Sequence, residues 1–177
     1  MAGQGIERSG FPDALDSFLA PQMKSRAMSG RAILLADRFR MEYRILKAVS
    51  LCFDDIHIVG AGNGAWLKYS RHCSSFYDLG KAFALAGPCE AEAIEGYAKA
   101  HQVSCILPTC GHTTRFLAAY PDRFETPCFP IPALQAFDLL NNKLTFHRLC
   151  RDLDLPVPST QIFESWSDLR AAAATGA

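Results

Sequence analysis

Between residues 30 and 132, short apolar runs alternate with segments whose apolar residues recur at helical spacing. Residues 32–36 are apolar throughout, which is typical of a parallel strand buried on both faces. Residues 56–59 and 103–107 are further apolar runs, and residues 74–77 are a candidate short strand. This alternation predicts an α/β fold: a Rossmann-like three-layer domain with a parallel sheet and right-handed crossovers.

The segments between these runs predict the covering helices. The first crossover helix is expected from the spacing of Met41, Ile45, Leu46 and Val49. Pro88 and the glutamates after it suit the first turn of a second helix, because proline needs no N–H there and carboxylates favour the positive end of the dipole. A third helix is expected after the run at 103–107.

Proline positions and the two ends of the chain complete the expected organisation. Phe129 lies between two prolines, which favours a short edge strand. Residues 1–29 predict a flexible segment with a possible short helix. Residues 133–177 predict connecting helices, a strand at residues 161–163 and a helix around residues 171–174.

Composition and charge exclude several classes of function. Lys+Arg and Asp+Glu number 18 each, so the basic excess of a nucleic-acid-binding domain is absent. No apolar run approaches the roughly 20 residues that span a bilayer, and no membrane partner is expected. The seven cysteines form no ligand-spaced Cys/His cluster, so we expect no metal site, and reduced thiols in a cytoplasmic protein.

Ligands of an open parallel sheet gather outside the carboxyl ends of its strands. Asp37 follows the first strand, and Thr109, Gly111 and His112 follow the strand at 103–107. A threonine can bond backbone groups, a glycine allows close approach, and the next helix begins with free N–H groups. These four residues are therefore candidates for a substrate cleft, although Thr109 also suits the N-cap of that helix.

Three other features suggest chemistry that we reject. The glycines at residues 60–64 follow the second strand and are wrongly spaced for a dinucleotide fingerprint, so a flexible loop is favoured over an NAD site. Cys110 and His112 are two residues apart, which rarely places a base beside a nucleophile, and no Asp or Asn is recognisable as an orienting partner. His57, within an apolar strand, is expected to be a hydrogen-bonded sheet histidine.

Several short motifs occur in one order along residues 30–177. They are Tyr69-Ser70-Arg71, Leu107-Pro108-Thr109, Asn142-Lys143 with Phe146, and Leu155-Pro156-Val157-Pro158-Ser159-Thr160. The set resembles the N-terminal, pre-ATP-grasp domain of ATP-grasp proteins of the carbamoyl-phosphate-synthase-like and biotin-carboxylase-like kind, together with the beginning of an ATP-grasp lobe. Cys110-Gly111-His112 departs from the family, whose members often carry acidic residues after the Pro-Thr.

The resemblance implies a ligase that uses MgATP to convert a small-molecule carboxylate into an acyl phosphate, which an amine or another nucleophile then attacks. It implies that Lys143, at a helix start, contacts the nucleotide phosphates in the full-length parent. It also implies that the main ATP-binding lobes lie beyond residue 177, so this chain alone is expected to bind no cofactor and to be inactive. A homodimer is a further possibility.

Two other functions remain open at the level of the sequence. The chain could be a non-catalytic Rossmann-like binding or interaction module. A doubly wound reductase is a weaker alternative, because no glycine fingerprint follows the first strand.

Overall fold

We describe the fold from a computed structural model, which describes residues 30–163 and 165–175. The short helix predicted within residues 1–29 lies outside the described residues. The chain divides into two compact units, with the boundary between Leu134 and Gln135.

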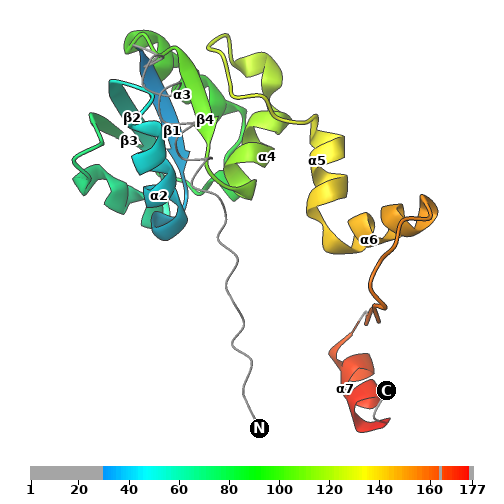
Figure 1. The fold of residues 1–177 in the computed structure, drawn as a ribbon. Helices are drawn as coiled ribbons and strands as arrows, with labels where there is room; N and C mark the ends of the chain where they lie inside the picture. Colours follow the sequence, from blue (N-terminus) through cyan, green and yellow to red (C-terminus); the bar gives the residue numbers. More distant parts are fainter. Residues whose placement is uncertain (1–29, 164, 176–177) are drawn as a thin grey trace, which may run out of the picture. The chain divides into compact units, whose positions relative to one another are not determined.

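A four-stranded parallel sheet forms the centre of the first unit (Figure 1). Its strands are β1 (Arg31–Ala36), β2 (Asp55–Gly60), β3 (Ser75–Asp78) and β4 (Cys105–Pro108). They lie in the order β3-β2-β1-β4, and every neighbouring pair is parallel. The α/β fold with a parallel sheet that the sequence predicts is therefore confirmed.

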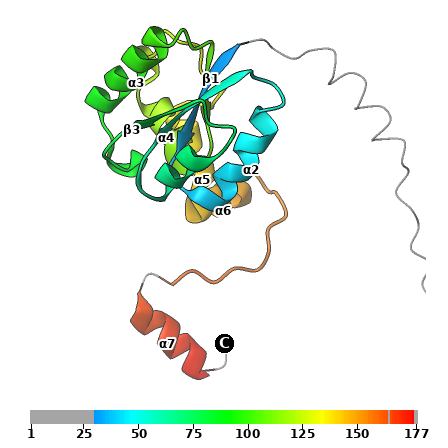
Figure 2. The same cartoon turned by 90° about the vertical axis from the view of Figure 1, so that its left-hand side faces the viewer.

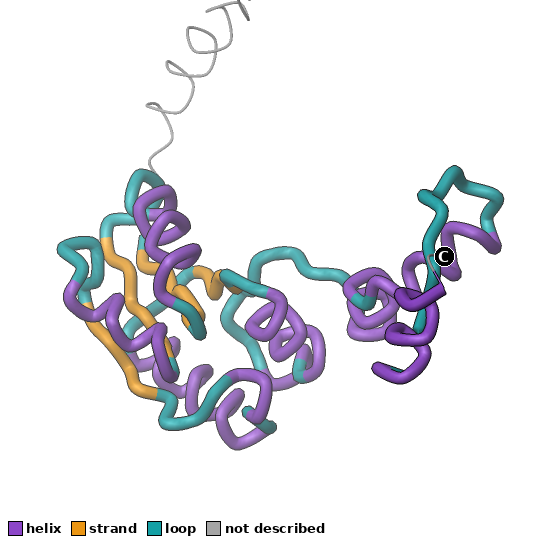
Figure 3. The backbone as a smooth tube through the Cα atoms, turned by 90° about the horizontal axis from the view of Figure 1, so that it is seen from below, coloured by secondary structure: helices purple, strands orange, loops and turns teal. Residues whose placement is uncertain are grey.

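Helices cover both faces of this sheet. One side carries α2 (Phe39–Val49) and the 3₁₀ helix η1 (Gly62–Tyr69), and the other carries α3 (Pro88–Ala100) and α4 (Gly111–Ala119). Figure 2 shows α2 and α3 on opposite sides of the strands, and Figure 3 shows the strands, in orange, between helical segments. The domain therefore has three layers, because the segments that connect the parallel strands pack as helices on both faces of the sheet.

The side chains of β1 alternate between two apolar clusters. Ile33 and Leu35 pack with residues of α3 and α4, whereas Leu34 and Ala36 pack with residues of α2 and η1. All four are fully buried. Residues 32–36 of the strand are therefore apolar at every position, which is why they show no polar alternation.

The buried face of α2 differs from the predicted one. Met41 is 65% exposed, and the neighbouring Glu42 is completely buried beside Leu46. The periodicity of apolar residues misplaces this face because the helix directs a carboxylate inward, where it accepts backbone hydrogen bonds from the loop after β1. The predicted start of β4 is also two residues early, since the strand begins at Cys105.

The glycine-rich segment after β2 is a 3₁₀ helix, not the flexible loop that the sequence predicts. A Cβ at Gly64 would lie 2.5 Å from the carbonyl oxygen of Ala36, and a Cβ at Gly60 would lie 2.8 Å from the ring of Phe76. Both glycines therefore allow neighbouring segments to approach closely.

Short elements complete the first unit: the 3₁₀ helices η2 (Phe83–Leu85) and η3 (Pro121–Arg123). The predicted edge strand around Phe129 is reduced to one bridge between Cys128 and Ile106 of β4, because only Pro127 and Phe129 exchange backbone hydrogen bonds with Ile106. The segment does lie at the edge of the sheet, as predicted.

Within the second unit, α6 (Lys143–Asp152) is capped by Asn142, whose side chain accepts hydrogen bonds from the backbone N–H groups of Leu144 and Thr145. The described residues also form α5 (Leu134–Asn141), whose first residue belongs to the first unit, and α7 (Trp166–Thr175). The helix α7 confirms the helix predicted around residues 171–174. Within the described part of the chain, none of the helices combines the length and the hydrophobicity that spanning a bilayer requires.

The strand predicted at residues 161–163 is absent (Figure 3). No other described segment forms a ladder with these residues, and an extended backbone without a hydrogen-bonded neighbour is not a strand.

Candidate functional site

The carboxyl ends of β1 and β4 lie next to each other, since Leu35 of β1 pairs with Pro108 of β4. In the sheet, β2 lies on one side of β1 and β4 on the other. The connection after β1 leads to α2 on one face of the sheet, and the connection after β4 leads to α4 on the opposite face. Such a switch point is where open α/β sheets bind ligands. The loops carry Asp37 on one side and Thr109, Gly111 and His112 on the other, as the sequence predicts.

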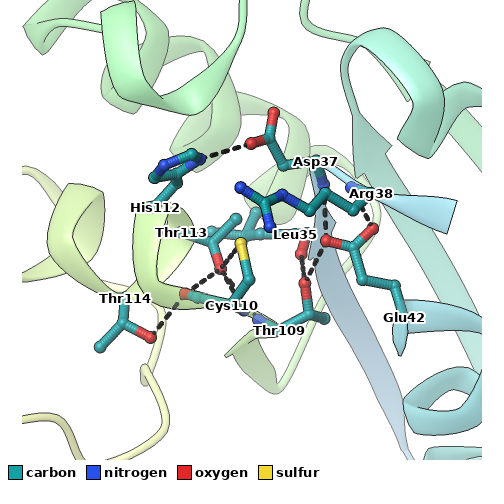
Figure 4. A network of polar contacts seen from close by, with 9 residues as sticks. All are labelled: Leu35, Asp37, Arg38, Glu42, Thr109, Cys110, His112, Thr113 and Thr114. Carbon is teal, nitrogen blue, oxygen red and sulfur yellow. Dashed lines mark hydrogen bonds and ion pairs between the residues drawn. The ribbon is translucent and has the colours of Figure 1, made fainter. Parts of the chain in front are cut away.

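Glu42 holds the loop after β1 in place (Figure 4). Its Oε1 accepts a hydrogen bond from the backbone N of Asp37 at 2.8 Å, and its Oε2 accepts one from the backbone N of Arg38 at 2.7 Å. These two N–H groups immediately precede α2, so the carboxylate also caps the helix from within its first turn.

Thr109 connects the two loops. Its hydroxyl lies 2.6 Å from the carbonyl oxygen of Leu35 and 2.9 Å from Oε1 of Glu42. The single hydroxyl proton can serve only one of these two acceptors at a time. Thr109 is therefore a tie between β4 and β1, and the N-cap of α4 is the next residue, Cys110.

Thr113 fixes the start of α4. Its Oγ1 accepts hydrogen bonds from the backbone N of Thr109 at 2.9 Å and from the backbone N of Cys110 at 3.0 Å. Thr113 is completely buried. The backbone of the loop that carries Cys110 and His112 is thus held by a side chain from the helix that follows it.

His112 and Asp37 face each other across the two loops. Nδ1 of His112 lies 2.7 Å from Oδ2 of Asp37, and the two side chains are 44% and 11% exposed. The sequence reveals no orienting carboxylate for this histidine because Asp37 lies 75 positions away. The expectation that no carboxylate orients His112 is therefore wrong, because the tertiary structure places Asp37 beside it.

The Cys110 thiol completes the group. One ligand atom each from Asp37, Cys110 and His112 lies within 4.8 Å of the other two. Gly111, between Cys110 and His112, adds no side chain to this group.

Burial raises the pKa of Glu42 above its ordinary value, and the hydrogen bonds from Asp37, Thr109 and Arg38 partly oppose that rise. A protonated Glu42 can donate to the Thr109 hydroxyl, which then donates to Leu35, so every acceptor in the chain is served. The site therefore contains a buried carboxyl group that is held neutral more easily than an exposed one.

Sequence reasoning missed Glu42 and Thr113. The signal for Glu42 is an acidic residue in the first turn of a helix that follows a buried strand. For Thr113 it is a threonine three residues after the N-cap, where a side chain can reach back to the N-cap backbone.

Lys143 belongs to the second unit and occupies the first position of α6. Its side chain is exposed and makes no hydrogen bond or ion pair with any described residue. The ammonium group stands at the N-terminal end of α6, and the positive end of the helix dipole favours anions there.

His57 has the structural role that the sequence predicts. Its Nδ1 lies 2.6 Å from Oγ of Ser75 and 3.1 Å from the hydroxyl of Tyr97, and its ring packs against His101. Burial lowers its pKa, and the positive charge of a protonated His101 lowers it further.

No protein-family model matches the chain, and no curated protein does either. Among solved structures, the chain is similar to the biotin carboxylase domain of a single-chain bacterial carboxylase (20% identity, TM-score 0.49, 82% of this chain and 34% of that one). It is similar to Rhizobium etli pyruvate carboxylase (22%, 0.47, 75% and 14%). It is also similar to the biotin carboxylase domain of Hydrogenobacter thermophilus 2-oxoglutarate carboxylase, solved as a dimer with MgADP, ADP and bicarbonate (20%, 0.45, 81% and 32%).

The chain thus spans about a third or less of the length of these structures. These structures include biotin carboxylase domains, the kind of protein that the sequence motifs resemble. At these identities the similarity is one of fold, and it extends to no residue and no activity.

Proposed function

We propose that the chain is the N-terminal domain of an ATP-grasp ligase. The complete enzyme would activate a small-molecule carboxylate with MgATP as an acyl phosphate and join it to an amine or another nucleophile. MgATP would supply the phosphoryl group, and the main nucleotide-binding lobes would lie outside this chain. Within this chain, Lys143 would contact phosphate, and the loops after β1 and β4 would line the substrate cleft.

The position of Lys143 is the observation that carries the proposal. The lysine opens a helix that Asn142 caps, it follows the order of motifs that resembles the family, and its ammonium group has no partner among the described residues. An exposed cation at the positive end of a helix dipole is a suitable contact for a phosphate.

The cleft residues support the same function in a different way. Asp37 and His112 lie at the switch point of the sheet, where α/β proteins bind small molecules. The backbone around both residues is held by buried side chains, Glu42 and Thr113, so the loops are organised before a substrate arrives.

Replacing Lys143 with alanine in the full-length parent tests the phosphate contact. A charged hydrogen bond is worth about 1.5–3 kcal/mol, so ATP affinity should fall roughly ten- to a hundredfold. The unfolding free energy should change by less than about 0.5 kcal/mol, because the side chain is exposed. Affinity by calorimetry and stability by urea unfolding are measured on the same samples.

Arg148→Ala is the matched control, since Arg148 is an exposed cation on the same helix. It should leave ATP affinity within about twofold. Equal losses in both variants would show a general effect of charge, and an unchanged affinity in Lys143→Ala would remove this residue from the site. Carboxylate-dependent ATP hydrolysis by the full-length protein tests the reaction itself.

The interaction module remains the second candidate, and exposed aromatic residues favour it. Trp66 and Tyr69 of η1 are 61% and 72% exposed, and Phe39 and Tyr43 of the neighbouring α2 are stacked on each other and partly exposed. Exposed aromatic side chains of this kind mark protein contacts. A homodimer through this surface would show in the molar mass by light scattering, and Trp66→Ser should then restore the monomer.

A further inference from the structure

Asp37, Cys110 and His112 bring a carboxylate, a thiol and an imidazole to one point between the loops after β1 and β4. Their ligand atoms lie within 4.8 Å of one another. We infer that these three side chains form a binding site for Zn²⁺, which cross-links the two loops at the carboxyl edge of the sheet.

The backbone that carries each ligand is already fixed. The N–H of Asp37 is bonded to Glu42, and the N–H of Cys110 is bonded to Thr113. Both Glu42 and Thr113 are completely buried. His112 follows within the first turn of α4. Ligands on a held backbone lose little entropy when a metal binds, which is what a metal site requires of its scaffold.

The three ligand atoms need movements of about 1 Å to reach the spacing of a tetrahedral zinc site. Zinc bonds of about 2.0–2.3 Å place neighbouring ligand atoms about 3.3–3.7 Å apart. Here Nδ1 of His112 and Oδ2 of Asp37 are 2.7 Å apart and joined by a hydrogen bond. Metal entry would replace that hydrogen bond and separate the two atoms by less than about 1 Å, a movement that the 44% exposed His112 side chain can make.

The set of ligands selects the cation. A thiolate prefers Zn²⁺ and other soft divalent ions and disfavours Mg²⁺ and Ca²⁺, which bind oxygen ligands. The Asp37 carboxylate and the Cys110 thiolate together balance the double charge of the ion. On binding, the thiol proton passes to the buffer. Three protein ligands leave a fourth position for water or an anionic ligand.

A cysteine nucleophile is the alternative use of the same residues, and the contacts favour metal binding. In a nucleophilic triad one imidazole nitrogen bonds the carboxylate and the other receives the proton of the thiol. Here Cys110 makes no hydrogen bond to His112, and its sulfur lies 3.7 Å from Oγ1 of Thr113. All three ligand atoms instead converge on one another.

The competing thiols differ in their availability. Burial raises the pKa values of Cys73 and Cys105, and that of Cys128 to about 11, which disfavours their thiolates. Cys52 and Cys89 are exposed and provide matched control variants. Cys89→Ser is the closer match, because Cys89 lies in the first turn of α3 as Cys110 lies at the start of α4.

The experiment titrates Zn²⁺ into the reduced, metal-free chain by calorimetry and repeats the titration with Co²⁺ under an absorbance readout. One equivalent should bind, with a thiolate-to-cobalt charge-transfer band that reports the cysteine ligand. Cys110→Ser, His112→Gln and Asp37→Asn should each weaken Zn²⁺ binding at least tenfold. Cys110→Ser should also abolish the charge-transfer band. Cys52→Ser and Cys89→Ser should change neither measurement.

A second readout keeps the inference testable if one variant folds poorly. Zn²⁺ should raise the unfolding midpoint of the wild type, as any ligand of the native state does. It should not raise the midpoint of those site variants, among Cys110→Ser, His112→Gln and Asp37→Asn, that fold. Equal Zn²⁺ affinity in wild type and site variants, or a charge-transfer band that persists in Cys110→Ser, would overturn the site. None of these measurements involves ATP, so their failure is separate from a failure of the ligase proposal.

Discussion

Glu42→Gln tests whether the buried carboxyl group organises the loop after β1. The two oxygens of Glu42 receive the backbone N–H groups of Asp37 and Arg38. Glutamine has one carbonyl oxygen, so one of these N–H groups would face an NH₂ group instead of an acceptor. The Thr109 hydroxyl adds no cost, because it keeps the carbonyl oxygen of Leu35 at 2.6 Å.

The expected loss of unfolding free energy is therefore that of one unsatisfied donor, about 1–3 kcal/mol. Urea unfolding followed by circular dichroism measures it. Trp66 lies in the first unit and Trp166 in the second, so Trp66 fluorescence in a Trp166→Phe background reports the first unit alone. The matched control is Glu92→Gln, which removes an exposed ion pair with Arg123 and should cost no more than about 0.5 kcal/mol.

The difference in unfolding free energy between wild type and Glu42→Gln should depend on pH, and the direction of that dependence can be worked out. The folded pKa of Glu42 is raised by burial, so between the unfolded and folded pKa values the native state binds more protons than the unfolded state. Its contribution to stability is therefore complete below the unfolded pKa, about 4.3, and is lost as the pH rises through the folded pKa. Glutamine does not titrate, so the stability advantage of wild type over Glu42→Gln should grow as the pH falls.

Two results would refute this reasoning. One is a loss in Glu42→Gln no larger than that in Glu92→Gln, which would mean that the backbone donors are satisfied in another way. The other is a stability advantage that shrinks as the pH falls, which would mean that the native state binds the carboxylate form more tightly.

Three further predictions follow from the packing and the exposed segments. Gly64→Ala should cost about 1–3 kcal/mol, because its Cβ would lie 2.5 Å from the carbonyl oxygen of Ala36, whereas Gly96→Ala, which meets no atom within 4 Å, should be neutral or stabilising by thermal unfolding. The lowered pKa of His57 means that its contribution is present above about pH 6.5 and is lost as the pH falls through the folded pKa; His57→Asn should flatten that part of the stability profile. Hydrogen exchange should be fast at residues 156–163, whose backbone N–H groups donate to no described residue.

Local patterns determined the larger part of the fold. Fully apolar runs of five residues predict strands that are buried on both faces, and β1 is such a strand. Proline and acidic residues at the start of α3 and the Asn142 cap of α6 act within one turn of helix, so the sequence shows them directly. The edge position of Asp37 and His112 also follows from sequence, since parallel strands end at one edge.

Only the tertiary structure decided features that depend on packing between distant segments. The inward face of α2 is set by Glu42 and not by Met41, because backbone donors of the loop after β1 need an acceptor there. Position 64 must be glycine because a Cβ there would lie 2.5 Å from the carbonyl oxygen of Ala36, and no local sequence pattern reveals this contact. Asp37 meets His112 and Cys110 because β4 pairs with β1, and that pairing joins segments far apart in the sequence, so the residues of either loop do not reveal it.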